Sequence, residues 1–530
     1  MTYKILITDD LSPQSLIMLE EARDVVFDVV RGLTPETLAE QIPEYDALIV
    51  HSTVSVTEAI FASASKLKVV GCAGVEVDNI NINAASMRGI IVMNTPGANT
   101  IATSEHTLAL MLALCRHLPQ AHISLKAGEW NRKAFVGQQL YRRTVGIIGM
   151  GRIGTRVALR CQSFGMTVVV YDPYLSDEVA HKLKIKPVDL NELLGQADFI
   201  SLHAAYTRQT AGIINLDTIT QMKDGVRIIN TARGGLIDEV ALFKGIKSGK
   251  IAGVALDVFA DEPLAKDSPL LELNNVIVTP HLASSTVEAQ RDVGMQVVDQ
   301  VLDALRGKDF RNALNIPIRD SNVLKTLHPY LSVAEKIGSL HAQLAGGAIN
   351  RVEIEIKGRK IRDHIKPITV AILKGLLAPV LVESINYINA PLLARKRGIA
   401  VSETQGLPTI EYPNIISCRV AWDGGEQTMA ATLFNENEPR LVQMDEYRLD
   451  VRPDGVLLVI GGCDKPGFIG RVGTLLGEHD INIAAWRYAR DKPYGNALSF
   501  LRVDTDVSET VMSALRGLDL VVWAKKVVLD

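Results

Sequence analysis

The sequence predicts an α/β protein with parallel sheets over residues 1–300 and smaller α+β units after them. Two observations support this fold class. Short apolar stretches alternate with helical patterns throughout residues 1–300, which is typical of parallel sheets covered by helices. Residues 456–528 follow the order strand, helix, strand, strand, helix, strand, which is the ferredoxin-like arrangement. The chain is therefore expected to divide into several domains.

Length, composition and charge exclude several classes of protein. The 530 residues are enough for three or more domains, because a soluble domain usually has about 100–200 residues. Lys and Arg number 56 against 60 Asp and Glu, and the resulting net charge of −4 argues against binding nucleic acid through bulk charge. No apolar run approaches the roughly 18 residues that a membrane span needs, so no membrane partner is expected.

The N-terminus and the cysteines indicate the compartment. The opening segment MTYKILITDD reads as a strand and lacks the apolar core and cleavage site of a signal peptide. The five cysteines are scattered along the chain without a CxxC pair. They match neither a disulfide framework nor a zinc site, so we expect a cytoplasmic protein without a bound metal.

Residues 1–98 and 286–316 are expected to form one discontinuous domain. Strands are predicted at 3–8, 47–50, 69–72 and 90–94, and a long helix should follow, because apolar residues recur at three-to-four spacing from Leu108 to Leu125. A second series of strands comes next, at 144–149, 167–172, 199–203, 227–230, 253–258 and 276–279. The helix that contains residues 293–305 should then return to the first domain. Residues 99–285 are therefore expected to be an inserted domain.

A polar stretch with prolines near residues 312–320 marks the next boundary. Beyond it we expect a helix at 330–344, a strand at 352–356 and a helix at 371–388, within an α+β domain over residues 317–450. The last domain, residues 453–530, should contain strands at 456–461, 483–490, 497–503 and 521–528, with helices at 469–478 and 508–515.

A glycine-rich turn predicts a dinucleotide site in the inserted domain. The strand in TVGIIGMGRIG runs directly into Gly149, Gly151 and Gly154, which permit a tight turn, close approach to a pyrophosphate and close strand–helix packing. The next strand ends at Asp172, whose carboxylate can accept both ribose hydroxyls and would repel a 2′-phosphate, so NAD is favoured over NADP. A glycine turn without a nucleotide is the alternative, which this context disfavours. Both domains of the first 316 residues are expected to be Rossmann-like, doubly wound units.

Polar side chains after the later strands should converge, because ligands bind at the carboxyl ends of the strands in a doubly wound sheet. His281 follows the strand at 276–279 and can take the proton of a secondary alcohol. Glu262, in DEP, can fix the tautomer of that imidazole. Arg233, in NTARGGLID, can hold a substrate carboxylate with two parallel hydrogen bonds. Each residue also has a structural alternative: His281 as a turn residue, Glu262 as a solvated loop acid and Arg233 as an ion-pair partner.

These motifs resemble the D-2-hydroxyacid dehydrogenase family, whose catalytic residues match Arg233 in ARGG, Glu262 in DEP and His281 in TPH. Within that family the chain is most similar to the long-form 3-phosphoglycerate dehydrogenases. The similar segments include NTPGANTIATSEHTLALMLALCR, LKAGEWNRKAF, ALDVFADEP and TPHLASSTVEAQ. The segment KGLLAPVLVESINYINAPLLARKRGI resembles the intervening domain of those enzymes, and DKPGFIGRVGTLLGEHDINIA resembles an ACT regulatory domain.

The resemblance implies oxidation of 3-phospho-D-glycerate by NAD to 3-phosphohydroxypyruvate, the first step of L-serine biosynthesis. It implies pyrophosphate contacts at Arg152 and Ile153 and a ribose contact at Asp172. Further cofactor contacts are implied at Val75, Ala204, Thr231, Ala232, Arg233, Asp257 and His281. Substrate contacts are implied at Ser52, Gly74, Val75, Asn99 and Arg233, and phosphate contacts at Arg132 and Lys133, which a neighbouring subunit can supply.

The chain departs from the family pattern near the expected substrate loops. His51 stands where an anion-binding Arg is usual, Cys72 where many members have Arg, and Glu76 where a glycine is usual. These changes weaken the case for a phosphorylated substrate and leave the hydride-transfer residues intact. A dehydrogenase of another D-2-hydroxy acid is therefore one alternative, and an NAD(H)-sensing binding protein of the corepressor type is another.

The resemblance to an ACT domain implies an effector site. In such domains effector amino acids bind between two paired domains, near a DxPG turn and an Asn. The corresponding residues here are Asp464, Gly467 and Asn482. L-serine is the effector implied, and a dimerisation module without a ligand is the alternative. A homodimer or homotetramer is usual in the family.

Overall fold

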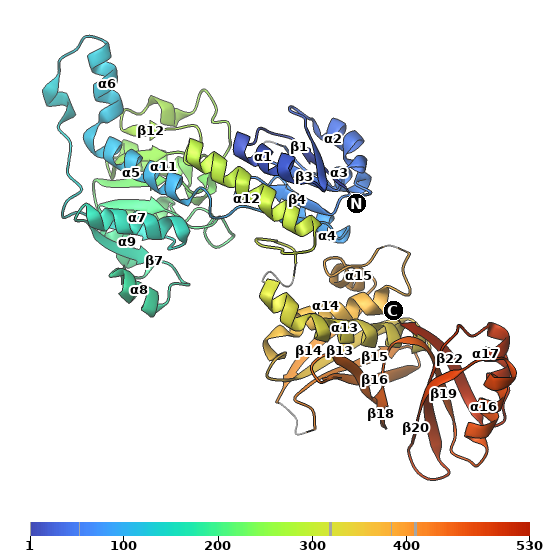
Figure 1. The fold of residues 1–530 in the computed structure, drawn as a ribbon. Coiled ribbons are helices and arrows are strands. Elements are labelled where there is room, and N and C mark those ends of the chain that lie inside the picture. Colours follow the sequence, from blue (N-terminus) through green and yellow to red (C-terminus); the bar gives the residue numbers. More distant parts are fainter. Residues whose placement is uncertain (1, 52–53, 317–320, 383, 408–410, 530) are drawn as a thin grey trace.

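The computed structural model describes residues 2–51, 54–316, 321–382, 384–407 and 411–529. Within these residues four sheets form two lobes, as Figure 1 shows. One lobe holds the two parallel sheets of the N-terminal half, and the other holds the two sheets that lie between residues 349 and 529. The predicted fold class is confirmed. In the part of the chain that the structure describes, no helix is both long and apolar enough to cross a bilayer.

The first sheet has five parallel strands in the order β2-β1-β3-β4-β5. Its central strands are fully buried, which suits a parallel sheet covered on both faces. The strands are β1 (Tyr3–Ile7), β2 (Val25–Val29), β3 (Ala47–Val50), β4 (Val69–Cys72) and β5 (Ile91–Met93). Its helices in this part of the chain are α1 (Pro13–Glu21), α2 (Pro35–Gln41), α3 (Glu58–Ser63) and α4 (Ile82–Met87).

Helix α12 (Val287–Leu305) packs on this first sheet, although the second sheet separates it from β5 in sequence. A Cβ on Gly71 of β4 would lie 2.6 Å from a methyl carbon of Val301, so this close packing requires glycine. After the helix, Arg306 pairs with Asp24 through two hydrogen bonds of 2.9 and 2.5 Å. The chain therefore returns to the first sheet after the inserted domain, as predicted.

The second sheet has seven parallel strands in the order β12-β11-β10-β9-β6-β7-β8. Its strands are β6 (Thr144–Ile148), β7 (Thr167–Tyr171), β8 (Lys186–Pro187), β9 (Phe199–Leu202), β10 (Val226–Asn230), β11 (Ile251–Leu256) and β12 (Val276–Val278). Its helices are α5 (Thr100–Arg116), α7 (Arg152–Ser163), α8 (Asp177–Leu183), α9 (Leu190–Gln196), α10 (Leu216–Gln221) and α11 (Glu239–Lys247). The carboxyl ends of β10, β11 and β12 therefore meet at one edge.

The third sheet has six strands in the order β14-β13-β15-β16-β17-β18, in which only the β13–β14 pair is parallel. The strands are β13 (Ile349–Gly358), β14 (Ala400–Gly406), β15 (Asn414–Trp422), β16 (Gly425–Phe434), β17 (Glu438–Met444) and β18 (Tyr447–Val451). The helices of this unit are α13 (Ser321–Leu344), α14 (Ile365–Leu377) and α15 (Ala390–Lys396). A Cβ on Gly375 of α14 would lie 1.9 Å from the Glu335 carbonyl oxygen, so α13 and α14 cross closely there.

The fourth sheet is antiparallel, in the order β20-β21-β19-β22, and it has the predicted ferredoxin-like connectivity. Its elements are β19 (Gly455–Cys463), α16 (Phe468–Glu478), β20 (Ile483–Arg490), β21 (Asn496–Val503), α17 (Glu509–Arg516) and β22 (Val521–Leu529). Leu457, Phe500 and Val527 from this sheet share one apolar core with the third sheet and its helices. The third and fourth sheets therefore form one lobe.

Two sequence predictions of local structure are wrong, and several strands, among them β2, were not predicted. The long helix predicted to continue to Leu125 is two helices, α5 and α6 (Leu118–Lys126), because His117 takes a left-handed conformation and Pro119, in the first turn of α6, cannot continue the hydrogen bonds of α5. The helix predicted at 371–388 is α14, which spans Ile365–Leu377 and ends two residues before Pro379, because proline has no backbone N–H to continue the helical hydrogen bonds. Strand β2 was not predicted, since it is a half-exposed edge strand without a buried apolar run.

Candidate active site

The glycine turn connects β6 to α7 at the carboxyl edge of the second sheet. Gly149 has φ +95°, and a Cβ there would lie 2.6 Å from the backbone nitrogen of Ala204. A Cβ on Gly154 would lie 2.1 Å from the Gly149 carbonyl oxygen. Gly151, the N-cap of α7, faces open space, so the first turn of the helix is accessible to an anion. The turn therefore has the space and the positive potential that a pyrophosphate requires.

Asp172 lies beside this turn, directly after β7. Its Oδ2 accepts a hydrogen bond of 2.6 Å from the Met150 amide, and its Oδ1 accepts one of 2.8 Å from the Tyr174 amide. The side chain is only partly buried. The carboxylate is therefore fixed at the rim of the turn, where the adenosine ribose is expected.

Arg152 and Ile153 occupy the first turn of α7. The Arg152 guanidinium donates a hydrogen bond of 3.0 Å to the Pro96 carbonyl, at the junction between the two parallel sheets. The backbone of both residues lies at the predicted pyrophosphate position. The structure therefore brings together Gly149, Gly151, Arg152, Ile153, Gly154 and Asp172.

His281 and Glu262 form a hydrogen-bonded pair. The Nδ1 of His281 lies 2.8 Å from the Oε2 of Glu262, and Glu262 Oε1 accepts a 3.0 Å hydrogen bond from the Phe259 amide. Both side chains are more than one-third exposed, at 39% and 37%. Since Nδ1 is engaged, Nε2 is the ring nitrogen that remains for proton exchange.

Asp257 supports the loop that carries His281. The side chain of Asp257 is fully buried, and its oxygens accept 2.8 Å hydrogen bonds from the amides of Leu282 and Ala283. Its Oδ1 also lies 2.5 Å from the Thr279 hydroxyl and 3.2 Å from Nε2 of His106. Burial raises the pKa of Asp257, but the hydrogen bonds outweigh burial and lower that pKa below its ordinary value. The carboxylate is therefore ionised and holds the loop in place.

Arg233 follows β10, and its loop is shaped by Asn230. The Asn230 side chain accepts from the Ala232 amide at 3.0 Å and donates to the Arg233 carbonyl at 2.8 Å. A Cβ on Gly234 would lie 1.9 Å from the Phe259 carbonyl carbon, so the Arg233 and Glu262 loops pack directly against each other. The three predicted catalytic residues therefore lie on adjoining loops.

The guanidinium of Arg233 has a partner that the sequence did not indicate. Its Nη2 lies 2.6 Å from Oε1 of Glu76, which belongs to the loop after β4 of the first sheet. Glu76 was identified from the sequence only as a departure from the family pattern. The ion pair joins the two parallel-sheet domains across the site.

The loop that contains Gly74 and Val75 is held in place by hydrogen bonds that its carbonyl oxygens accept. The Thr95 amide donates to the Gly74 carbonyl at 2.8 Å, and the Asn94 side chain donates to the Val75 carbonyl at 2.6 Å. Nearby in sequence, Oδ1 of Asn99 is buried without a hydrogen-bond partner among the described residues.

The other predicted contact residues lie in different surroundings. Ala204 and Ala232 are partly buried, and the Thr231 hydroxyl lies 2.7 Å from the Thr107 hydroxyl. Arg132 and Lys133 are exposed, in a short 3-10 helix (Arg132–Phe135) that follows α6 in the chain. Helix α6 belongs to an arm that projects from the rest of its lobe in Figure 1. Ser52 lies outside the described residues.

The sequence analysis did not identify His106 as a site residue, and the motif TIATSEHTLAL was its only signal in the sequence.

The predicted effector residues lie at two ends of the fourth sheet. Asp464 accepts hydrogen bonds from the Tyr488 hydroxyl at 2.7 Å and from Arg490 at 2.9 Å, and these bonds lower the pKa of Asp464. Asp464 and Gly467 line one pocket. Asn482 lies before β20, at the end opposite Arg490, and donates to Asp504 at 2.5 Å. One copy of the domain therefore does not bring Asn482 to the Asp464 turn.

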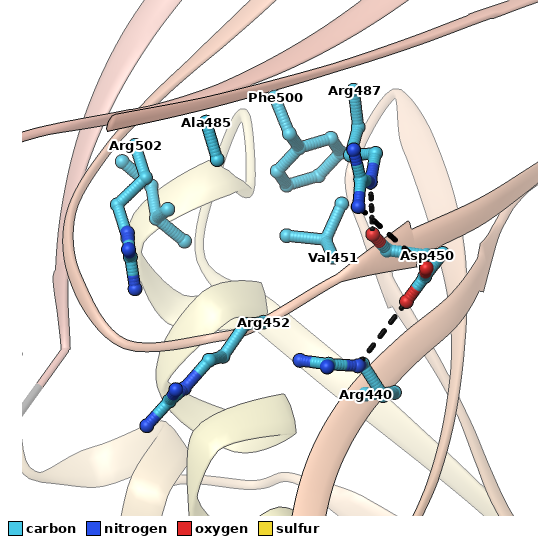
Figure 2. A pocket seen from close by; sticks show the side chains of 9 residues that line it. Arg440, Asp450, Val451, Arg452, Ala485, Arg487, Phe500 and Arg502 are labelled. Atoms are coloured by element: carbon cyan, nitrogen blue, oxygen red, sulfur yellow. Dashed lines mark hydrogen bonds and ion pairs between the residues drawn. The ribbon is translucent and has the colours of Figure 1, made fainter. Parts of the chain in front are cut away.

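A second pocket, at the junction of the third and fourth sheets, is rich in arginine (Figure 2). It has a volume of about 180 Å³. Asp450 lies between Arg440, at 3.2 Å, and Arg487, whose Nε donates to the Asp450 carbonyl at 2.8 Å. Arg452 and Arg502 both pair with Asp454, at 2.6 and 3.1 Å. Arg440 also lies 3.2 Å from Glu438, so four guanidinium groups share three carboxylates where the two sheets meet.

Comparison with known proteins identifies the family. Residues 108–283 match the NAD binding domain of D-isomer specific 2-hydroxyacid dehydrogenases, and residues 326–445 match the D-3-phosphoglycerate dehydrogenase intervening domain. The chain is 44% identical to a D-3-phosphoglycerate dehydrogenase of Methanocaldococcus jannaschii, with 97% of each chain covered. It is 40% identical to that of Bacillus subtilis, with 99% of each chain covered. The chain belongs to the D-3-phosphoglycerate dehydrogenase family.

Solved structures resemble more than half of this D-3-phosphoglycerate dehydrogenase family member. The Aquifex aeolicus D-lactate dehydrogenase, solved with NAD and lactic acid, is 30% identical with a TM-score of 0.52 and covers 57% of this chain and 96% of its own. The TT0316 protein of Thermus thermophilus is 34% identical with a TM-score of 0.55, and it covers 59% of this chain and 99% of its own. The chain is thus an NAD-dependent oxidoreductase, and NAD is its cofactor.

Proposed function

We propose that this enzyme oxidises 3-phospho-D-glycerate to 3-phosphohydroxypyruvate with NAD, the first step of L-serine biosynthesis. The observation that carries the proposal is the His281–Glu262 pair beside Arg233 at the NAD-binding edge of the second sheet. The near full-length similarity to enzymes named D-3-phosphoglycerate dehydrogenase supports this substrate. Their dehydrogenase names also favour an enzyme over a corepressor-type binding protein.

The residues divide the reaction between them. NAD bound at the glycine turn supplies the hydride acceptor. Arg233 binds the substrate carboxylate and orients the C2 carbon, because its planar donors match a carboxylate. His281 takes the proton of the C2 hydroxyl at Nε2 as the hydride leaves C2. Glu262 holds Nδ1 of His281 and so keeps Nε2 directed at the substrate.

The test compares substrates. Formation of NADH should be fastest with 3-phospho-D-glycerate, and much slower with D-glycerate, D-lactate and D-2-hydroxyglutarate. His51, Cys72 and Glu76, which depart from the family pattern, favour the second candidate, a dehydrogenase of another D-2-hydroxy acid. A clear preference for an unphosphorylated acid would establish that second candidate.

We also propose the domain assignment and the oligomer. The substrate domain comprises residues 1–98 and 286–316, the NAD domain 99–285, the intervening domain 317–450 and the ACT domain 453–530. The arm around α6 supports a homodimer or homotetramer, because Trp130 and Val136 are 79% and 78% exposed there, with other apolar side chains nearby. In such an oligomer Arg132 and Lys133 would approach the neighbouring site. Analytical ultracentrifugation tests the assembly.

L-serine is the proposed effector of the ACT domain. The polar pocket around Asp464 and Gly467 supports an amino-acid site there, and pairing of two domains would bring Asn482 of one copy toward the turn of the other. Titration calorimetry with serine, together with an activity assay, tests this proposal. We expect heat of binding and inhibition of the enzyme. The absence of both at millimolar serine would refute the proposal. We place the enzyme in the cytoplasm, since its five cysteines are unpaired.

A further inference from the structure

Glu76 and Arg233 form an ion pair between two different domains. Glu76 follows β4 of the first sheet and Arg233 follows β10 of the second, and the two side chains lie 2.6 Å apart. Each side chain is about one-third exposed, at 30% and 33%. The pair therefore crosses the region in which the catalytic loops and the substrate loop face each other.

The position of Glu76 is set by an anchored loop. The thiol of Cys72, which is fully buried, donates a 3.0 Å hydrogen bond to the Glu76 carbonyl. Three residues later, the Asn79 side chain donates to the Val54 carbonyl at 2.6 Å. With its backbone fixed on both sides, Glu76 holds its carboxylate toward Arg233, and the exposed part of the side chain leaves it room to turn toward solvent.

The guanidinium of Arg233 has a limited set of donors for a carboxylate. Its Nη1 donates a 2.5 Å hydrogen bond to the Ala232 carbonyl, and its Nη2 binds Glu76. A guanidinium makes two parallel hydrogen bonds either through Nε and Nη2 or through Nη1 and Nη2, so both arrangements use Nη2. A second carboxylate that binds in this way must approach the Glu76 carboxylate closely, and the two like charges repel.

We propose that Glu76 is an internal competitor for Arg233: its carboxylate must leave the guanidinium before the substrate carboxylate binds, and Glu76 thereby sets the KM of the enzyme. The proposal rests on the proposed role of Arg233 as the carboxylate site. Glu76 acts through Arg233 and is a positioning residue. Because every 2-hydroxy acid presents the same carboxylate, the competition raises KM equally for phosphorylated and unphosphorylated substrates.

The experiment compares E76Q with the wild-type enzyme at saturating NAD. E76Q removes the charge and nearly preserves the shape of the side chain. We expect the KM for 3-phospho-D-glycerate and for D-glycerate to fall by the same factor, about three- to tenfold, with kcat unchanged within about twofold. Oxamate has a carboxylate and a neutral amide, and so carries no second charge. Its dissociation constant from the complex of enzyme and NADH should fall by a similar factor. The matched control is D78N, which removes an exposed carboxylate from the same loop and should change none of these values.

Two outcomes would overturn the inference. An unchanged or higher KM in E76Q, with unchanged oxamate binding, would show that Glu76 does not compete with the substrate carboxylate. A fall in KM for the phosphorylated substrate alone would show that Glu76 repels the phosphate instead. Failure of the proposed function is distinguishable, because a wild-type enzyme that does not oxidise 3-phospho-D-glycerate would still report the Glu76 effect through oxamate binding.

Discussion

His281 Nδ1 and Glu262 Oε2 lie 2.8 Å apart, on loops that follow the neighbouring strands β12 and β11. Glu262 is itself held by the Phe259 amide, so the imidazole is oriented by a carboxylate that cannot easily move away. This arrangement assigns proton transfer to His281 and its orientation to Glu262. The two residues should therefore respond differently to substitution.

Replacing His281 with Ala should lower kcat by about two to four orders of magnitude, the usual range for loss of a general acid–base group. E262Q should lower kcat by about 10- to 100-fold, because the histidine remains but its orientation weakens. Steady-state NADH formation measures both effects. NADH affinity, followed by fluorescence, should stay within about twofold in E262Q and serves as the control for that variant. Unchanged turnover in H281A would mean that another group accepts the proton.

Arg233→Lys should raise KM for the substrate and lower kcat. Lysine keeps the positive charge but cannot make two parallel hydrogen bonds to a carboxylate. Loss of one charge-assisted hydrogen bond predicts a fall in kcat/KM of about 10- to 100-fold. Initial rates over a range of substrate concentrations separate the two constants. Arg132→Lys, on the exposed arm, is the matched charge-conserving control, and it should reduce kcat/KM less than R233K does.

The sequence was sufficient to predict the positions of site residues that follow strands of a single sheet. Arg233, Glu262 and His281 each follow a strand, and parallel strands end at a common edge, so their placement on adjoining loops could be predicted from the chain alone. Asp172 beside the glycine turn follows from the same rule. The last domain was also predicted closely, because each of its strands and helices has its own apolar pattern.

Features that depend on two distant segments could not be predicted. The pairing of Glu76 with Arg233 requires the relative position of two domains, on which no local pattern reports. His106 reaches Asp257 from a helix whose motif does not indicate a partner. The break at His117, by contrast, is local, because Pro119 interrupts the apolar helical pattern directly after it. Tertiary placement, and not local propensity, determines the contacts of Glu76 and His106.

Asp172→Ala should weaken NAD binding and relax the preference for NAD over NADP. The carboxylate is expected to bind the ribose hydroxyls and to repel a 2′-phosphate, and it also accepts the Met150 amide of the glycine turn. We expect KM for NAD to rise about tenfold or more, and the NAD/NADP ratio of kcat/KM to fall by at least as much. Initial rates with both cofactors measure this. A retained preference for NAD would assign cofactor selection to another residue.

His341 predicts an acid-sensitive contribution to stability in the C-terminal lobe. The side chain is fully buried on α13, its Nε2 lies 3.1 Å from the Cys418 carbonyl, and burial lowers the pKa of His341 to about 4. An unfolded histidine has a pKa of about 6.5, so between these values the unfolded chain binds a proton that the folded protein does not. The stabilisation is therefore present above about pH 6.5 and is lost as the pH falls toward 4.

Linkage gives a loss of about 2 kcal/mol between pH 7 and pH 5 for this group. The thermal midpoint of the wild-type protein should therefore fall further over this interval than that of H341Q, which keeps a donor for the Cys418 carbonyl and does not titrate. H328Q, an exposed histidine on the same helix, is the matched control and should behave as wild type. Equal shifts in wild type and H341Q would show that His341 does not contribute to the acid sensitivity. Burial also lowers the pKa of His203, to about 3, but His203 is common to all three proteins and cancels in the comparison.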